Sequence, residues 1–327
     1  MVGKISYKMR SAVIALLLIT ISAAGYSQSL KEAQQLFNAG IQAKKEDPQT
    51  ALQKFKECIE VSKAVGEEAQ EVLSRAQSQL PVVYYYVGRD EYKAKNYDGM
   101  TNAFRKAIET GEKYNKTVVE SKARQVLSQY FRNRGLQHYQ QENLAMAKTY
   151  LDSAVYYYKE SHKGHYYLAQ VNLKQENEKQ FRMHMAEAFA LSEQNNDPKF
   201  RNKSQNVLRN FFLKKANDAM EEEAYQQTVN YADSALDYDS TASLAYYLKT
   251  QSHNSLKEYN QAIKAGNQAL KYESGGDQAK AKIYYEIGNA YKALDNKSEA
   301  CEAFRKAAYG DFKKRANYEI EEELDCE

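Results

Sequence analysis

The chain carries an internal repeat in which a small residue is followed, at steps of 12, 16 and 19 positions, by further small or apolar residues. In the clearest of seven copies, Gly288 is followed by Ala300, Phe304 and Ala307. The other copies begin at Gly88, Gly135, Ala39, Ala169, Ala216 and Thr250. A fixed period of this kind indicates a stack of similar units, each of which obtains part of its core from its neighbours.

Each copy has the pattern of two helices joined by a turn. Apolar residues recur at steps of three and four positions over two segments of roughly 12 to 15 residues, which is the helical period. In the last copy the pattern predicts helices over 283–293 and 298–308, with a turn at 295–297. Small side chains at the repeated positions allow close approach of the two helix axes, and bulky residues such as Phe304 fill the space beside them.

The last copy, with Tyr284, Gly288, Tyr291, Ala300 and Phe304, resembles the tetratricopeptide repeat, a helix-turn-helix hairpin of about 34 residues. The resemblance extends from about Ala33 to Ala308. It implies an all-α solenoid of about seven hairpins followed by a C-terminal capping helix. Wider spacing before Gly135 and Ala216 predicts lengthened first helices there, and Pro81 should kink or divide another long helix.

The N-terminal residues differ from the rest of the chain. Lys4, Lys8 and Arg10 precede an apolar run over 12–24, and small residues surround a cleavage point before Gln28. We predict a secretory signal peptide over 1–27, a repeat array over 28–310, and a capping helix with an acidic tail over 311–327. The mature protein should be exported to the periplasm, with secretion from the cell as the alternative. A retained anchor is disfavoured because spanning a bilayer takes about 20 apolar residues.

The C-terminal segment has two interpretations. Ile320 and Leu324 lie four positions apart and could cover the last hairpin while the surrounding acids face water, as terminal repeats require. The acids could instead form an interaction tail. Cys301 and Cys326 could pair if the last helix folds back, or Cys326 could link two chains, whereas Cys58 occupies a core position.

Composition and motifs argue against several functions. Lys and Arg number 46 against 43 Asp and Glu, and three of the basic residues but none of the acids lie in 1–27, so no basic excess remains for nucleic acid. The chain has no phosphate-binding loop, nucleophile elbow or zinc-binding His-Glu-x-x-His helix. His162, His165 and His184 lack accompanying Cys or paired carboxylates, so surface or capping roles are favoured over a metal site. We expect no cofactor and no enzymatic activity.

The family resemblance implies a concave surface lined by the first helices, with the residue three positions before each small position facing the groove. Four such positions hold tyrosine: Tyr85, Tyr166, Tyr247 and Tyr285. The predicted partner-binding set is Tyr85, Arg89, Tyr92, Arg132, Tyr139, Tyr166, Leu213, Tyr247, Tyr285 and Asn289. The alternative is that the rings pack in the core or between repeats. Asn289 matches the family's clamp for C-terminal carboxylates, but Tyr285 replaces its lysine, so that clamp is not predicted.

These features favour a non-enzymatic scaffold of the cell envelope that binds a peptide segment or helix of a partner protein in its groove. A preformed groove loses little conformational entropy when it binds. The alternative is a soluble periplasmic protein that binds a glycan or small solute, because aromatic rings also stack on sugar faces.

Overall fold

The computed structural model describes residues 29–326, so the predicted signal peptide lies outside the described residues. Two compact units divide the chain, and their described parts are residues 29–161 (unit 1) and 162–326 (unit 2). Over residues 29–326 the regular elements are helical and no strand occurs. The all-α prediction is therefore confirmed.

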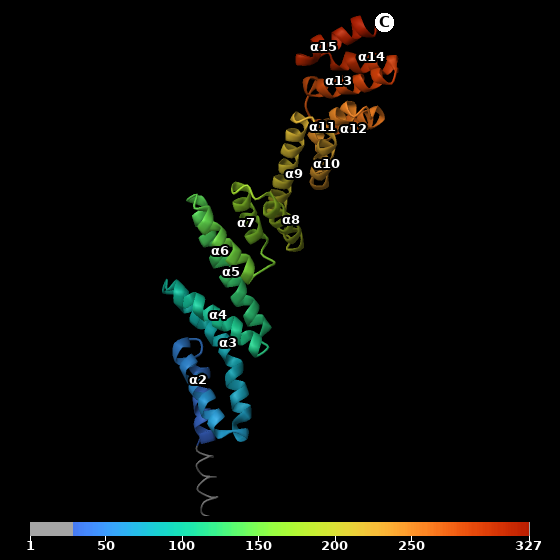
Figure 1. Cartoon of the computed structure of the whole chain (residues 1–327). Coiled ribbons are helices and arrows are strands. Elements are labelled where there is room, and N and C mark those ends of the chain that lie inside the picture. Colours follow the sequence, from blue (N-terminus) through green and yellow to red (C-terminus); the bar gives the residue numbers. More distant parts are fainter. Residues whose placement is uncertain (1–28, 327) are drawn as a thin grey trace, which may run out of the picture. The chain divides into compact units, whose positions relative to one another are not determined.

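Unit 1 contains three antiparallel helix pairs (Figure 1). Helical residues 29–43 pack on α2 through Phe37 and Phe55, whose ring centroids lie 5.7 Å apart. A 3₁₀ turn, η1 (Glu67–Ala69), leads into the second pair. The paired elements are α2 (Pro48–Val65), α3 (Gln70–Lys93) with α4 (Tyr97–Lys113), and α5 (Thr117–Gln140) with α6 (Leu144–Tyr157).

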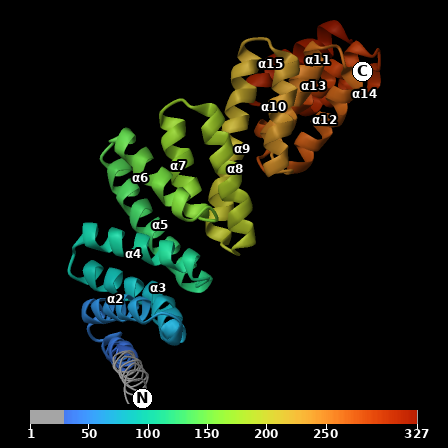
Figure 2. The same ribbon diagram turned by 60° about the horizontal axis from the view of Figure 1, so that its bottom comes forward.

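Unit 2 contains four further pairs and a C-terminal cap (Figure 2). The pairs are α7 (His162–Lys174) with α8 (Glu178–Gln194), α9 (Pro198–Glu221) with α10 (Tyr225–Tyr238), α11 (Ser243–Ser255) with α12 (Tyr259–Tyr272), and α13 (Asp277–Ala293) with α14 (Lys297–Ala307). As predicted from the spacing, α5 and α9 are long, with 24 residues each.

Close helix approach occurs at the repeated small positions. A Cβ on Gly288 would lie 2.7 Å from the ring of Phe304, and one on Gly88 would lie 3.1 Å from the ring of Phe104. In the first hairpin the sequence frame is wrong by one residue, because Gly40, not Ala39, packs on Phe55. The glycines are needed because no room remains for a side chain where the helices cross.

The hairpin turns also follow the repeat. Seven positions after each small residue from Gly88 onward, a non-glycine residue adopts left-handed backbone conformation with φ of 58 to 61°: Lys95, Glu142, Glu176, Glu223, Lys257 and Asp295. In three hairpins the next residue is an asparagine whose side chain accepts a hydrogen bond from the first turn of the second helix: Asn96, Asn143 and Asn177. This turn ends one helix and starts the next within a few residues.

Pro81 does not divide α3, which continues from Gln70 to Lys93. The C-terminal segment forms a cap on the last hairpin: η2 (Gly310–Phe312) and α15 (Lys313–Tyr318) lead into a π-helical turn, η3 (Glu319–Glu323). Ile320 and Leu324 pack on the cluster that contains Phe304, which confirms the capping interpretation. A disulfide joins Cys301 to Cys326, and Cys58 is a free thiol in the core.

Candidate binding groove

Unit 1 contains an open cavity of about 620 Å³ between α3, α4 and α5, which we call the tyrosine groove. Its lining consists of Tyr85, Arg89, Tyr92 and Lys93 from α3, Tyr97, Met100 and Phe104 from α4, and Val126, Gln129, Tyr130, Asn133, Arg134 and Gln137 from α5. A volume of this size lies in the range of protein sites that hold a small ligand or part of a peptide.

Tyrosine rings form one wall of the groove. Tyr92 lies in the last turn of α3 and Tyr97 begins α4, so the tight turn between them places their ring centroids 6.2 Å apart, edge to face. Tyr97 stacks in turn on Tyr130, with centroids 5.6 Å apart and ring planes 27° apart. Tyr92 is 56% exposed and Tyr97 is 42% exposed. These rings therefore offer apolar area and hydroxyl groups at a wall that is already packed.

The floor is formed by core residues of the same hairpins. Phe104 and Met100 are buried, and Tyr85 packs on Phe104 with centroids 5.4 Å apart. Tyr130 is half-buried, and its burial raises the pKa of its phenol, so the ring stays neutral over the physiological range. A ligand in the groove thus meets tyrosine hydroxyl groups above a packed apolar floor.

The charged groups of the lining are all cationic: Arg89, Lys93 and Arg134. Within the described residues, Arg89 is exposed and makes no ion pair, while Arg134 donates to Gln137 and its Nε has no acceptor. Lys93 pairs with Asp90 at 2.8 Å. A second cavity of about 260 Å³ shares Arg89 and Lys93 with the groove and adds Lys45 together with Asp90, the partner of Lys93.

Of the sequence-predicted residues, the structure brings Tyr85, Arg89 and Tyr92 together in the tyrosine groove. Arg132 and Tyr139 lie on α5 but do not line the cavity. The sequence reasoning missed Tyr97, Tyr130 and Arg134. A signal for two of them existed, since Val126, Tyr130, Arg134 and Gln137 follow one face of the long helix at steps of four, four and three.

Comparison with known proteins gives structural neighbours only. No family model matches the chain, and no curated protein matches it. Similar solved structures include YrrB, described as a TPR protein with an unusual peptide-binding site (15% identity, 54% of this chain and 82% of that chain, TM-score 0.32). MamA AMB-1 is 16% identical, over 56% of this chain and 90% of that chain, with a TM-score of 0.34. The P58(IPK) TPR domain is 13% identical, over 97% of this chain and 85% of that chain, with a TM-score of 0.31.

At these sequence identities and TM-scores, the ligands of the neighbours say nothing about a ligand of this chain. The description of the repeat therefore depends on the geometry of its own hairpins. Each hairpin from α3 onward joins two antiparallel helices by a tight turn, and Gly88, Gly135 and Gly288 face the second helix of their own hairpins at the repeated spacing. The hairpins have the helix-turn-helix form and spacing that the resemblance to the tetratricopeptide repeat implies. The array in unit 1 therefore presents the tyrosine groove mainly on first helices, α3 and α5, of two successive repeats.

In the hairpins of unit 2, the predicted groove tyrosines pack against neighbouring elements. Tyr166 lies 5.4 Å from the ring of Phe200, and Tyr285 lies 5.5 Å from the ring of Phe304. Tyr247 packs beside Ile283 and Ile287, and burial together with Glu286 raises its pKa to about 12. Leu213 is half-buried against the cluster around Phe212, and Asn289 is half-buried on α13.

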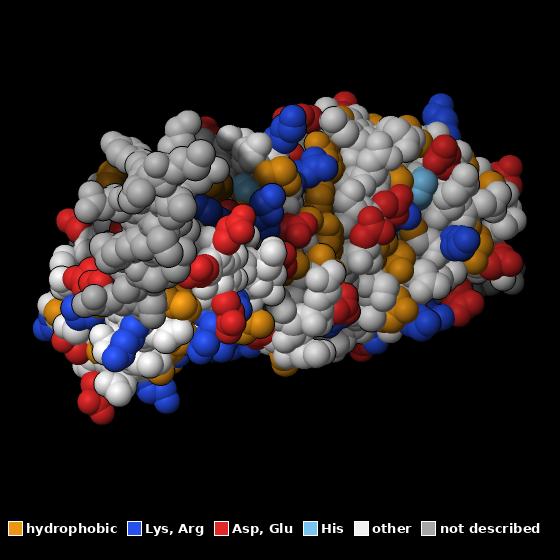
Figure 3. Space-filling view, turned by 90° about the horizontal axis from the view of Figure 1, so that it is seen from below, with side chains coloured by type: hydrophobic (Ala, Val, Ile, Leu, Met, Phe, Trp, Pro, Cys, Tyr) orange, Lys and Arg blue, Asp and Glu red, His pale blue; other side chains and the backbone are white. Residues whose placement is uncertain are grey.

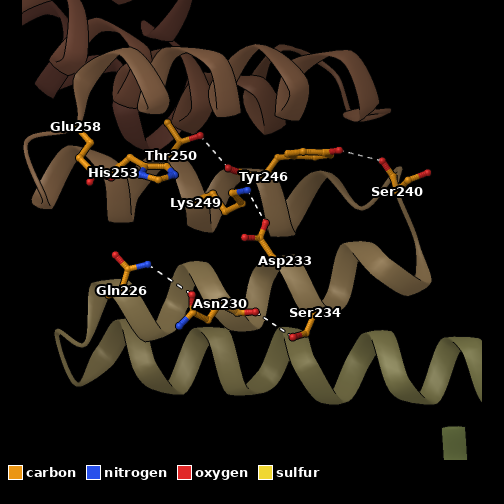
Figure 4. Close-up of polar contacts among 10 residues, drawn as sticks. All are labelled: Gln226, Asn230, Asp233, Ser234, Ser240, Tyr246, Lys249, Thr250, His253 and Glu258. Carbon is orange, nitrogen blue, oxygen red and sulfur yellow. Dashed lines mark hydrogen bonds and ion pairs between the residues drawn. The ribbon is translucent and has the colours of Figure 1, made fainter.

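Polar side chains of these unit 2 repeats bond largely to one another. Figure 4 shows Lys249 of α11 paired with Asp233 of α10, and Tyr246 donating to the carbonyl of Ser240. Asn254 donates to both the carbonyl and a carboxylate oxygen of Glu286, each at 2.9 Å. These contacts join successive helices, and among the residues named only the Oδ1 atom of Asn254 is buried without a hydrogen-bond partner.

The histidines of unit 2 take structural positions. His162 Nε2 lies 3.0 Å from Asp197, the residue that caps α9, and the Nδ1 atoms of His165 and His184 lie 3.0 Å apart. Within residues 29–326, no group of three or more His, Cys, Asp or Glu side chains is arranged to hold a metal ion. In the same part of the chain, no helix combines the length and apolar character needed to cross a bilayer.

The surface carries charges of both signs. On the face drawn in Figure 3, acidic and basic side chains are interspersed, and hydrophobic groups lie between them. A nucleic-acid binder usually concentrates basic residues on one face. The visible face lacks such a basic field among the residues that are described.

Proposed function

We propose that this chain is an exported, non-enzymatic interaction protein of the cell envelope that holds a segment of a partner protein in the tyrosine groove. The observation that carries the proposal is the open cavity of about 620 Å³ with exposed tyrosine rings and unpaired arginine on its wall. Preformed aromatic walls suit peptide binding, because rigid rings give contact area at low entropic cost.

The placement of the groove on two successive first helices supports this function. Tyr85, Arg89 and Tyr92 lie one helical turn apart along α3, and α5 supplies the opposite wall. An extended segment or a single helix turn fits between two such helices, which both pack against α4. Binding then requires little rearrangement of the repeats.

Crosslinking in the native envelope tests the proposal. A photoreactive residue in place of Tyr92 should capture one partner segment, identified by mass spectrometry, and the Tyr97→Ala variant should lose most of that product. Tyr156 on α6, which is 71% exposed and outside the cavity, is the control position. Equal capture from positions 92 and 156, or undiminished capture by the Tyr97→Ala variant, would contradict binding in the groove.

A glycan-binding function is the second candidate, and one observation favours it. Gln129, Asn133 and Gln137 lie at steps of four along α5, the helix that also carries Tyr130, and line the groove. Amides beside stacked rings are suited to sugar hydroxyl groups. Titration calorimetry with cell-wall oligosaccharides distinguishes the two: saturable heat with glycans, together with no capture from position 92, would favour the glycan.

Export is tested separately from binding. The mature protein recovered from the periplasmic fraction should begin at Gln28. If the protein is instead recovered in the membrane fraction with residues 1–27 uncleaved, the predicted signal-peptide cleavage is wrong.

A further inference from the structure

We infer that the tyrosine groove selects an acidic segment of its protein partner, with carboxylates beside Arg89 and Arg134 and apolar side chains against the tyrosine rings. This inference rests on the proposed function and adds the chemistry of the partner.

The charge of the groove is the first argument. Its lining includes three cationic side chains and no Asp or Glu. The nearby carboxylates are occupied: Asp90 pairs with Lys93, and Glu91 accepts hydrogen bonds from Asn96 and Gln49. Asp98 on α4 acts on Tyr130 through its charge but does not line the cavity. Two guanidinium groups thus remain without a carboxylate partner in the described structure.

Unit 2 provides the comparison within the same chain. There, cations of the first helices are matched by acids: Lys249 pairs with Asp233, Arg209 pairs with Asp239 at 2.9 Å, and Lys292 contacts both Glu319 and Glu323. Internal pairing of this kind is therefore readily available to the fold. Its lack at Arg89 and Arg134 indicates that the matching carboxylates come from another molecule.

The geometry of the two guanidinium groups suits carboxylates. Arginine presents a planar fork that can donate two parallel hydrogen bonds to one carboxylate. Arg134 is held in place, because it donates to Gln137 at 3.0 Å and lies over the ring of Tyr150. Arg89 lines both the tyrosine groove and the adjoining cavity that contains Lys45, so an extended segment could follow a basic path across both.

The apolar lining favours a peptide over an acidic sugar. Met100, Phe104 and Val126 lie at the base of the groove, and Tyr85 packs on Phe104. Met100 and Phe104 are already buried, so an apolar amino-acid side chain would cover Val126 and the exposed tyrosine rings above them, whereas the hydroxyl groups of a uronic acid would be left without partners there. The expected segment therefore combines Asp or Glu with aliphatic or aromatic residues.

The test uses the full chain and two synthetic peptide libraries with the same apolar positions. One library carries Asp and Glu at the remaining positions, and the other carries Asn and Gln. We expect only the acidic library to bind, and we expect Arg89→Gln and Arg134→Gln each to weaken the selected peptides roughly tenfold, a change that corresponds to one charge-assisted contact. Lys122→Gln is the matched control, because Lys122 is exposed on α5 and lies outside both cavities.

The possible failures are distinguishable. Equal binding of the amide library, or an equal loss with Lys122→Gln, would overturn the acidic assignment while leaving the groove as a peptide site. Binding of a polyuronate oligosaccharide that depends on Arg89 and Arg134, without binding of either library, would overturn the peptide partner and with it the proposed function. Circular dichroism of each variant verifies that the helices are intact.

Discussion

Tyr97 and Tyr130 stack across the boundary between two hairpins, with ring centroids 5.6 Å apart and planes 27° apart. Tyr97 belongs to the first turn of α4, and Tyr130 lies in the middle of α5. The pair therefore serves both the packing of adjacent repeats and the wall of the tyrosine groove.

A double-mutant cycle should detect this pairing. Aromatic pairs contribute about 0.5 to 1.5 kcal/mol beyond the area that they bury, so Tyr97→Ala and Tyr130→Ala should show a coupling energy of that size in urea unfolding. Tyr97→Ala should itself be the milder change, because its ring is 42% exposed. As a control, Tyr97→Ala combined with Tyr156→Ala should be additive. A coupling energy near zero for the first pair would show that the stacked geometry does not contribute to stability.

Gly288→Ala should destabilise the last hairpin. The added Cβ would lie 2.7 Å from the ring of Phe304, and such overpacking costs about 1 to 3 kcal/mol. The higher helix propensity of alanine offsets about 1 kcal/mol of this cost, so we expect the free energy of unfolding to fall by about 1 kcal/mol.

Two comparisons make this expectation specific. Gly88→Ala should be closer to neutral, since its Cβ would lie 3.1 Å from Phe104. Shortening the partner side chain by Phe304→Leu should make Gly288→Ala less costly in that background. If Gly288→Ala raises the free energy of unfolding in the wild-type background, the close approach seen at this position is not retained in solution.

The hairpins were predictable because their signals are local. The step of 16 from Gly88 to Phe104 depends only on two helices and a short turn of constant length, and the structure reproduces it in hairpin after hairpin. The first copy was misplaced by one residue because Ala39 and Gly40 are both small. Only the packed structure shows that Gly40 is the one against Phe55.

The candidate site was predictable on one helix and not between helices. Tyr85, Arg89 and Tyr92 share a face of α3, so helical spacing was sufficient to group them. Helical spacing also groups Tyr130 and Arg134 on one face of α5. The rotation of α5 against α4, which turns that face toward α3, is set by interhelical packing and cannot be read from the spacing. The same limit applies to Tyr247, whose burial against α13 follows from its neighbour and not from its own repeat.

Tyr247 should make the protein lose stability at high pH. Its folded-state pKa of about 12 lies above the unfolded value of 10.0, because burial and Glu286 disfavour the phenolate. The neutral phenol therefore stabilises the fold fully below pH 10, and this contribution is lost as pH rises from 10 through 12. The difference of about two between the folded and unfolded pKa values corresponds to a loss of at most about 2 to 3 kcal/mol in the free energy of unfolding.

Urea unfolding between pH 8 and pH 11 measures this effect. Tyr247→Phe should show a smaller loss of stability over this range than the wild type, whereas Tyr156→Phe, at an exposed position, should not differ from it. Parallel pH profiles for wild type and Tyr247→Phe would show that the phenol is not buried as described.

The Cys301–Cys326 disulfide should determine whether the cap stays on the last hairpin. It closes a loop of 25 residues between α14 and the end of the chain, and its Cα atoms lie 5.8 Å apart. Chain-entropy arguments assign about 3 kcal/mol to a loop of this length. The cap is otherwise held by Ile320, Leu324 and the ion pairs of Lys292 with Glu319 and Glu323.

Reduction of the disulfide, or the Cys326→Ser substitution, should therefore speed hydrogen exchange in α14 and α15. The change corresponds to a decrease of about 2 to 4 kcal/mol in the free energy of opening of these helices. Exchange in α3 and α4 should stay unchanged, because a repeat array transmits stability mainly between neighbours. A further variant, Lys292→Gln in the reduced protein, should release the cap more completely by removing its two ion pairs. If reduction leaves exchange in α15 unaltered, the ion pairs and apolar contacts are sufficient to hold the cap, and the disulfide adds little.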